Sequence, residues 1–101
     1  MQLKKYRWSK DYESAEEALI EWLAVRHVTA DRWALEEFEN IELQSLDHDR
    51  KLWCAEGSII YIVDGKRISL QTGDALDIPA NTPHQAQAGI SGCACYEATG
   101  K

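Results

Sequence analysis

The sequence predicts an all-β barrel or sandwich that carries one amino-terminal helix. From about residue 28 onward, apolar residues recur with a period of two in several short segments separated by turn residues. This pattern is typical of an antiparallel barrel or sandwich. Before it, the segment 15–26 has the period of an amphipathic helix. The chain has 101 residues, enough for one hydrophobic core but not for two.

The amino-terminal part divides into an arm and a helix. Residues 1–13 are polar with interspersed aromatic rings, which favours an arm or an edge strand. Ser14 followed by Glu17 has the spacing of a capping box, so we expect a helix over 15–26. Its apolar stripe opposes acidic residues and predicts that the helix covers the open end or the outer face of a sheet. We therefore expect residues 1–30 to pack on a barrel formed by 31–101, as one folding unit.

Alternating segments and turn residues define the predicted strands. Gly57 is expected to end one strand, and Asp64-Gly65 is typical of a two-residue hairpin turn. The run 36–38 breaks the alternation and is typical of a β-bulge. In order, the predicted strands cover 33–35, 41–43, 52–56, 59–63, 66–70, 75–78, about 83–91 and about 92–98.

One face of the strands around residue 57 predicts a contact surface. With simple alternation, Trp53 shares a side with Ile59, Tyr61 and Val63 and faces away from the barrel centre. An exposed apolar patch of that size is unusual on a monomer. We expect either the helix or a second subunit to cover it, and a homodimer is the preferred interpretation.

The segment 73–84 has a restricted backbone and ends in one histidine, His84. Pro79 cannot donate to a strand ladder, and Pro83 restricts Thr82 to extended geometry. His84 therefore follows a constrained stretch of backbone. A restricted backbone fixes the orientation of the side chain that follows it, as is expected for a residue of a functional site.

Gly73, Pro79 and His84 resemble the second motif of the cupin superfamily, in which five residues separate Gly from Pro and four separate Pro from His. The family has Asn four residues after the His, where this chain has Ala88. The resemblance covers roughly residues 33–98. It implies a small jelly-roll β-barrel of the RmlC-like type, a double-stranded β-helix, here with an added amino-terminal α-helix.

The resemblance also implies a divalent metal, but this chain departs from the first cupin motif. With Gly57 as its closing glycine, Arg50 occupies the Glu position. The two His positions fall on Gln44 and Leu46, or on Leu43 and Ser45 with the longer spacing. An inward guanidinium would repel a cation, so we predict no metal cofactor. If a divalent metal binds nevertheless, its ligands would be His84 with His48 or Gln44.

We predict that Arg50, His84, Gln44 and Cys54 bind a ligand inside the barrel. A buried guanidinium needs a partner, which could be Asp77, Glu56 or another carboxylate of this acidic chain. It could instead be an anionic ligand, whose carboxylate fits the planar fork of Arg. His84 is the candidate catalytic residue, as a general acid or base. The alternative is a structural histidine held by a backbone carbonyl.

The three cysteines allow two interpretations. Cys93 and Cys95 lie on the same side of a strand, and Cys54 has the parity of Arg50. Together with His84 they could bind zinc or hold a reactive thiolate. Alternatively, they pack as small hydrophobic side chains. Their odd number argues against a disulfide framework and favours reduced thiols in the cytoplasm.

Composition excludes two classes of partner and leaves three functions. A net charge of −6 disfavours nucleic acid, and no apolar run has the length of a membrane span. The first function is binding of a small metabolite, anions included, without a catalytic metal. The second is a metal-dependent enzyme of the oxygenase or isomerase type that uses His84 with atypical ligands. The third is a non-catalytic regulatory or interaction module.

Overall fold

The computed structural model describes residues 1–9 and 16–99. Its elements are β1 (Lys4–Arg7), α1 (Glu16–Val25), β2 (Asp31–Leu35), β3 (Asn40–Gln44), β4 (Arg50–Val63), β5 (Lys66–Gln71), β6 (Asp74–Ile78) and β7 (His84–Thr99). The predicted all-β architecture with one amino-terminal helix is confirmed. Ser14, which was expected to cap the helix, lies outside the described residues.

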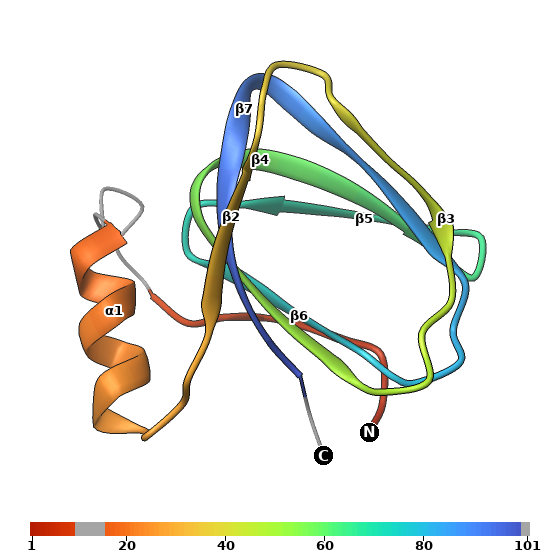
Figure 1. The fold of residues 1–101 in the computed structure, drawn as a ribbon. Coiled ribbons are helices and arrows are strands. Elements are labelled where there is room, and N and C mark those ends of the chain that lie inside the picture. Colours follow the sequence, from red (N-terminus) through yellow and green to blue (C-terminus); the bar gives the residue numbers. More distant parts are fainter. Residues whose placement is uncertain (10–15, 100–101) are drawn as a thin grey trace.

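The strands form one antiparallel sheet in the order β1-β6-β4-β7-β2. In addition, β3 pairs with β7 and β5 pairs with β4. Because β4 and β7 are long, each exchanges one neighbour for another along its length, and the sheet bends around a common interior (Figure 1). This is the jelly-roll barrel that the sequence predicts.

The strand β4 continues through Gly57, so the prediction that a strand ends there is wrong. The register between β4 and β7 shifts on both sides of this residue, which marks a β-bulge. Gly57 has a φ of 73°, and a Cβ at this position would lie 2.1 Å from the carbonyl oxygen of Gly92. Only glycine tolerates this close approach in the left-handed region. On the other side of the bulge, β7 is likewise one strand, where the sequence predicted two.

The bulge also reverses which side chains face inward. Leu52 and Cys54 lie in the inner core before it, and Ile59, Tyr61 and Val63 lie in the same core after it. The expectation that these last three share an outer face with Trp53 is therefore wrong. Simple alternation fails because one extra residue shifts the parity of everything that follows.

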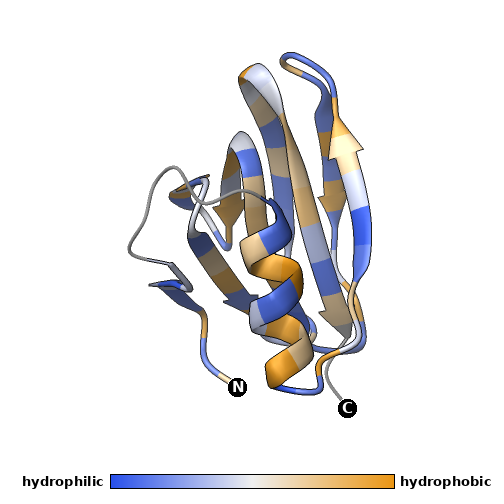
Figure 2. Ribbon diagram, turned by 90° about the vertical axis from the view of Figure 1, so that its left-hand side faces the viewer, coloured by the Kyte–Doolittle hydropathy of each residue, from blue (hydrophilic) through white to orange (hydrophobic). Residues whose placement is uncertain are grey.

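Two hydrophobic clusters lie on the two sides of the sheet. The inner cluster fills the barrel and includes Leu52, Ile59, Leu70 and Leu76. The outer cluster joins the sheet to α1, where Leu19 and Leu23 of the helix pack with Trp53. Figure 2 shows α1 lying against the outside of the sheet. Of the two places expected for the helix, the open end or the outer face of a sheet, the structure has the outer face.

The amino-terminal arm belongs to the sheet, because β1 pairs with β6 from Lys4 to Arg7. Between β2 and β3, the run 36–38 forms a turn rather than a bulge, with the Glu39 amide donating to the carbonyl of Glu36 over 3.1 Å. Across the described residues, no helix is both long and apolar enough to cross a membrane.

Candidate functional site

A buried ion pair lies at one end of the barrel interior. Arg50 opens β4, and its side chain is 7% exposed. Its Nε lies 2.6 Å from Oε2 of Glu97, and its Nη2 lies 2.5 Å from Oε1 of the same carboxylate. Planar, bidentate pairing of this kind is the strongest geometry that a guanidinium offers a carboxylate. Burial alone would lower the pKa of Arg50, but the bonds to Glu97 outweigh that effect and raise it.

The third nitrogen of the guanidinium contacts His84. Arg50 Nη1 lies 2.7 Å from Nε2 of the imidazole, and Nδ1 of His84 lies 2.8 Å from the carbonyl oxygen of Thr82. Arginine can only donate, so Nε2 must accept and the proton must sit on Nδ1. His84 is therefore a neutral imidazole with both nitrogens engaged. It begins β7, so it lies on a strand rather than on the constrained loop that precedes it.

Glu97 is the member of this cluster that the sequence prediction missed. The two partners named from the sequence lie elsewhere, since Glu56 is exposed and Asp77 lines a cavity beside the helix, and the third alternative, another carboxylate of the chain, holds. A signal for Glu97 was available, because it follows Cys95 by two residues on the same strand and therefore shares its inward side. Trp33 on β2 donates its indole N–H to Oε1 of Glu97 over 3.1 Å and fixes the carboxylate from a third direction.

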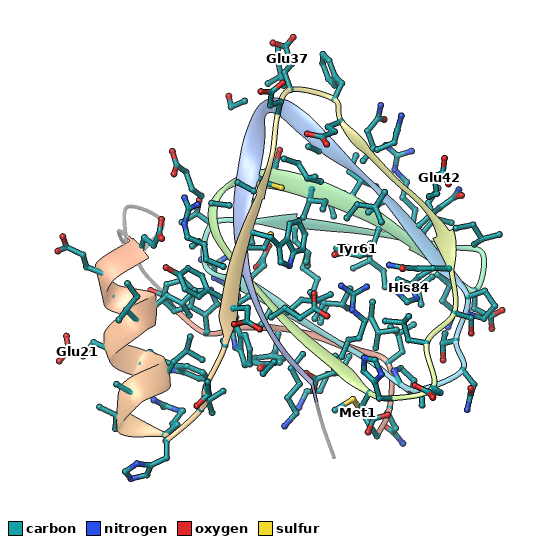
Figure 3. All side chains as sticks on the ribbon, viewed as in Figure 1. Met1, Glu21, Glu37, Glu42, Tyr61 and His84 are labelled. Carbon is teal, nitrogen blue, oxygen red and sulfur yellow. The ribbon has the colours of Figure 1, made fainter. Side chains whose placement is uncertain are left out.

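Tyr61 places an unsatisfied hydroxyl inside the barrel. The side chain is fully buried, and its hydroxyl has no hydrogen-bond partner among the described residues. The rings of Tyr61 and His84 lie with centroids 6.4 Å apart, and both side chains point into the barrel (Figure 3). Burial raises the pKa of Tyr61 far above its ordinary value, so the phenol stays protonated. A buried hydroxyl without a partner is uncommon and calls for an explanation, such as an unseen water or ligand.

The remaining predicted site residues are distributed around this cluster. Gln44 is the backbone partner of His84 across β3 and β7 and is half-buried. His48 lies at the surface, with Nδ1 3.2 Å from Oδ1 of Asp47. Cys54 lies in the inner core, opposite Cys95 on β7. The structure thus brings together Arg50 and His84 directly, and Gln44 only through the backbone.

All three cysteines are free and buried. Thiol contacts with Cys54 and Cys93, followed by burial, raise the pKa of Cys95. A contact with Cys95 lowers the pKa of Cys93. Among the described residues, no group of three or more His, Cys, Asp or Glu side chains is placed to hold a metal ion. Of the two interpretations of the cysteines, the structure favours the second, since all three pack in the inner core and do not form a metal-binding group with His84.

The donors at the barrel site do not fit the divalent metal that the cupin resemblance implies. The His84 Nε2 lone pair is directed at a guanidinium, and a permanent positive charge occupies the Glu position of the motif. Both oxygens of Glu97 already accept from Arg50. A cation in this place would face repulsion and no free imidazole.

A cavity of about 380 Å³ opens beside Glu97. Thr29, Asp31, Trp33 and Ala98 complete its lining. The side chain of Glu97 is 17% exposed, whereas that of Arg50 behind it is 7% exposed. A molecule in this cavity would therefore meet the carboxylate and the Trp33 ring before the guanidinium.

Comparison with known proteins gives the fold. No family model and no curated protein matches the chain. A DUF861 family protein from Thermotoga maritima aligns over 98% of this chain and 100% of its own, with 17% identity and a TM-score of 0.68. An RmlC-like cupin from Shewanella frigidimarina covers 96% of this chain and 74% of its own, with 18% identity and a TM-score of 0.65.

A third structure, a cupin superfamily protein from Desulfitobacterium hafniense, matches 95% of this chain and 74% of its own at 16% identity and a TM-score of 0.62. Sequence identities this low support a shared fold but no shared activity, ligand or partner. The protein is a small cupin-fold barrel, as the motif around His84 predicts.

Proposed function

We propose that this barrel binds a small polar molecule, without a catalytic metal, beside the cluster of Arg50, His84 and Glu97. The observation that carries the proposal is the buried Tyr61 hydroxyl, which has no partner among the described residues. A protonated phenol is a donor and an acceptor, so a polar atom of a ligand can satisfy it. The cavity beside Glu97 offers an approach to the cluster from outside.

The charges of the cluster define the class of ligand. Arg50 and Glu97 neutralise each other, and His84 is neutral, so the cluster has no net charge. A neutral molecule that carries hydroxyl or amide groups fits this arrangement. An anion, the alternative that the sequence suggested, would have to displace Glu97 from the guanidinium. A general acid or base role for His84 would require Arg50 to release Nε2.

The proposal also covers the cellular compartment and the oligomeric state. Three free cysteines support a reducing compartment such as the cytoplasm. The homodimer stays a prediction, to be checked by light scattering. The alternative of a non-catalytic interaction module has a precedent in the fold, since the Drosophila melanogaster CENP-C cupin domain, similar in structure at 16% identity, was solved bound to CAL1.

Tyr61→Phe tests the proposal. We expect neutral polyols or amides to raise the melting temperature of the wild-type protein and small aliphatic carboxylates such as acetate to leave it unchanged. Tyr61→Phe should lose that ligand-induced shift. Without ligand, its free energy of unfolding should rise by about 1 kcal/mol, because an unsatisfied buried hydroxyl is removed. Differential scanning fluorimetry and urea denaturation provide the two measurements.

Three outcomes would contradict the proposal. If Tyr61→Phe keeps the full ligand-induced rise in melting temperature, the Tyr61 hydroxyl does not contact the ligand. Wild-type protein that responds to no neutral polar compound would favour the interaction module. A stoichiometric transition metal in protein purified without chelators would favour the metal-dependent enzyme.

A further inference from the structure

A second cavity, separate from the barrel interior, lies between α1 and the outer face of the sheet. Its volume is about 380 Å³, at the small end of ligand sites. It is lined by Tyr6, Trp22, Arg26, Val28, Thr29, Lys51, Trp53, Asp77 and Ala98. The barrel cluster of Arg50, His84 and Glu97 lies on the other side of the sheet. The helix-side cavity shares Thr29 and Ala98 with the cavity beside Glu97, but none of the three cluster residues lines it.

Aromatic rings form the walls and floor of this helix-side cavity. Trp22 of α1 and Trp53 of β4 lie with ring centroids 6.2 Å apart at an interplanar angle of 58°. Tyr6 of β1 contributes a third ring, which is half-buried. Flat π surfaces that converge on one space favour a planar guest.

Two exposed cations line the same space. The guanidinium carbon of Arg26 lies 3.8 Å from the centre of the Trp22 ring, so the guanidinium stacks on that wall. Lys51 of β4 lies opposite Asp77 of β6 in the strand register. Within the part of the chain that the structure describes, neither cation forms an ion pair with a carboxylate. In a chain with a net charge of −6, two cations that line one cavity favour an anionic guest, although Asp77 opposite Lys51 offsets part of their charge.

The floor of the cavity holds an indole N–H that lacks an acceptor. Trp53 is 2% exposed, and its Nε1 has no hydrogen-bond partner among the described residues. The Tyr6 hydroxyl lies near this nitrogen, but the two atoms do not have hydrogen-bonding geometry. An oxygen placed beside both groups could accept from both. Tyr6 is thus only a poorly aligned acceptor for this donor, and an oxygen of a guest could complete the hydrogen bond.

We infer that the helix-side cavity binds a small aromatic carboxylate. The ring of the guest would lie against Trp22 and Tyr6, above the buried Trp53, and its carboxylate would lie near Arg26 and Lys51. Asp77, the one acidic side chain in the lining, disfavours a second negative charge. The inferred guest is therefore a monoanion rather than a phosphate ester or a dicarboxylate.

Benzoate is the probe for this inference, and the indole N–H resonances are its reporters. The chain has four tryptophans, so a ¹⁵N-labelled protein gives four indole signals. We expect benzoate to shift the signals of Trp22 and Trp53 in a saturable manner and to leave that of Trp33, which faces the barrel site, unchanged. Benzamide has the same ring without the charge and should bind about tenfold more weakly.

Variants of the two cations separate recognition from packing. The double variant Arg26→Gln and Lys51→Gln should fold normally, because both side chains are exposed, and should bind benzoate at least about tenfold more weakly. Lys66→Gln, on the exposed β4–β5 hairpin, is the matched control and should bind as the wild type does. The inference is overturned if benzoate causes no saturable shift at Trp22 and Trp53, if benzamide binds equally well, or if the double variant binds as tightly as the control.

Discussion

The two sides of the sheet are built by the same strands but hold different chemistry. Inside the barrel, apolar side chains surround the Arg50–Glu97 ion pair, a neutral His84 and the unsatisfied hydroxyl of Tyr61. Outside, the cluster beneath α1 consists of aromatic and aliphatic side chains such as Leu19, Leu23 and Trp53. Both clusters are well buried, so burial alone does not distinguish them.

The difference indicates that the polar groups inside the barrel need an explanation beyond stability, whereas the packing of the helix on the sheet does not. Removing an ion pair from water is costly, and well-packed apolar residues of similar size often stabilise a protein as much or more. A chain selected only for stability has no reason to place Arg50 and Glu97 in its interior. The outer cluster, by contrast, gains stability from apolar burial in proportion to the area covered.

Breaking the inner pair should give the largest effect. We expect Glu97→Ala to lower the free energy of unfolding by about 4 kcal/mol, because it leaves the guanidinium of Arg50 buried without its partner. Urea denaturation measures this loss. Glu56→Ala, at an exposed position of the neighbouring strand β4, is the control and should change little.

Replacing both Arg50 and Glu97 tests whether the loss of stability in Glu97→Ala comes from the unpaired charge. The double variant Arg50→Met and Glu97→Leu should recover most of the stability that Glu97→Ala loses, because no uncompensated charge remains. If the double variant is as unstable as the single one, the pair contributes to stability after all. The contrast between the two sides of the sheet would then fail.

The outer cluster should respond as an ordinary hydrophobic core. Leu19 is fully buried in it, so Leu19→Ala should lower the free energy of unfolding by about 3 kcal/mol through lost burial and a cavity. The barrel site should keep its ligand response at temperatures where the variant is folded. Ile20→Ala, at an exposed position of the same helix, provides the control for helix propensity. A Leu19→Ala variant that loses ligand binding while folded would couple the two sides.

The sequence predicts the fold well because its signals are local. The helical period of 15–26, the Asp64-Gly65 turn and the spacing of Gly73, Pro79 and His84 each depend on neighbouring residues. The bulge at Gly57 is different. It depends on the close approach of Gly92, which is distant in the sequence, and it reverses the inward parity of Tyr61. No local pattern distinguishes this glycine from one that ends a strand.

The sequence predicts only part of the cluster of Arg50, His84 and Glu97, for a related reason. Motif spacing placed Arg50 and His84 in the interior, and the structure brings them within 2.7 Å of each other. The partner of Arg50 could not be chosen from the sequence, because the chain has 17 acidic residues and pairing depends on which strand lies opposite. In the β4–β7 register Arg50 is paired with Thr99, and Glu97 lies two residues from that partner, on the inward side of β7. The register therefore determines that Glu97 is the carboxylate within reach of Arg50.

The attachment of the helix should show the smallest effect, and that effect should depend on pH. Oε2 of Glu16 in α1 accepts from Arg32 of β2 over 2.6 Å and from the Tyr96 hydroxyl of β7. The bond from Arg32, followed by that from Tyr96, lowers the pKa of Glu16 below its ordinary value of 4.5. Because the pKa is depressed in the folded state, the stabilisation is complete above pH 4.5 and is lost as the pH falls through the folded value. Glu16→Gln should therefore be less stable than the wild type at neutral pH, and the difference should shrink in acid. Glu17→Gln, on the exposed side of the same turn, should show no such trend, and a Glu16→Gln deficit that is constant with pH would mean that charge does not hold the helix to the barrel.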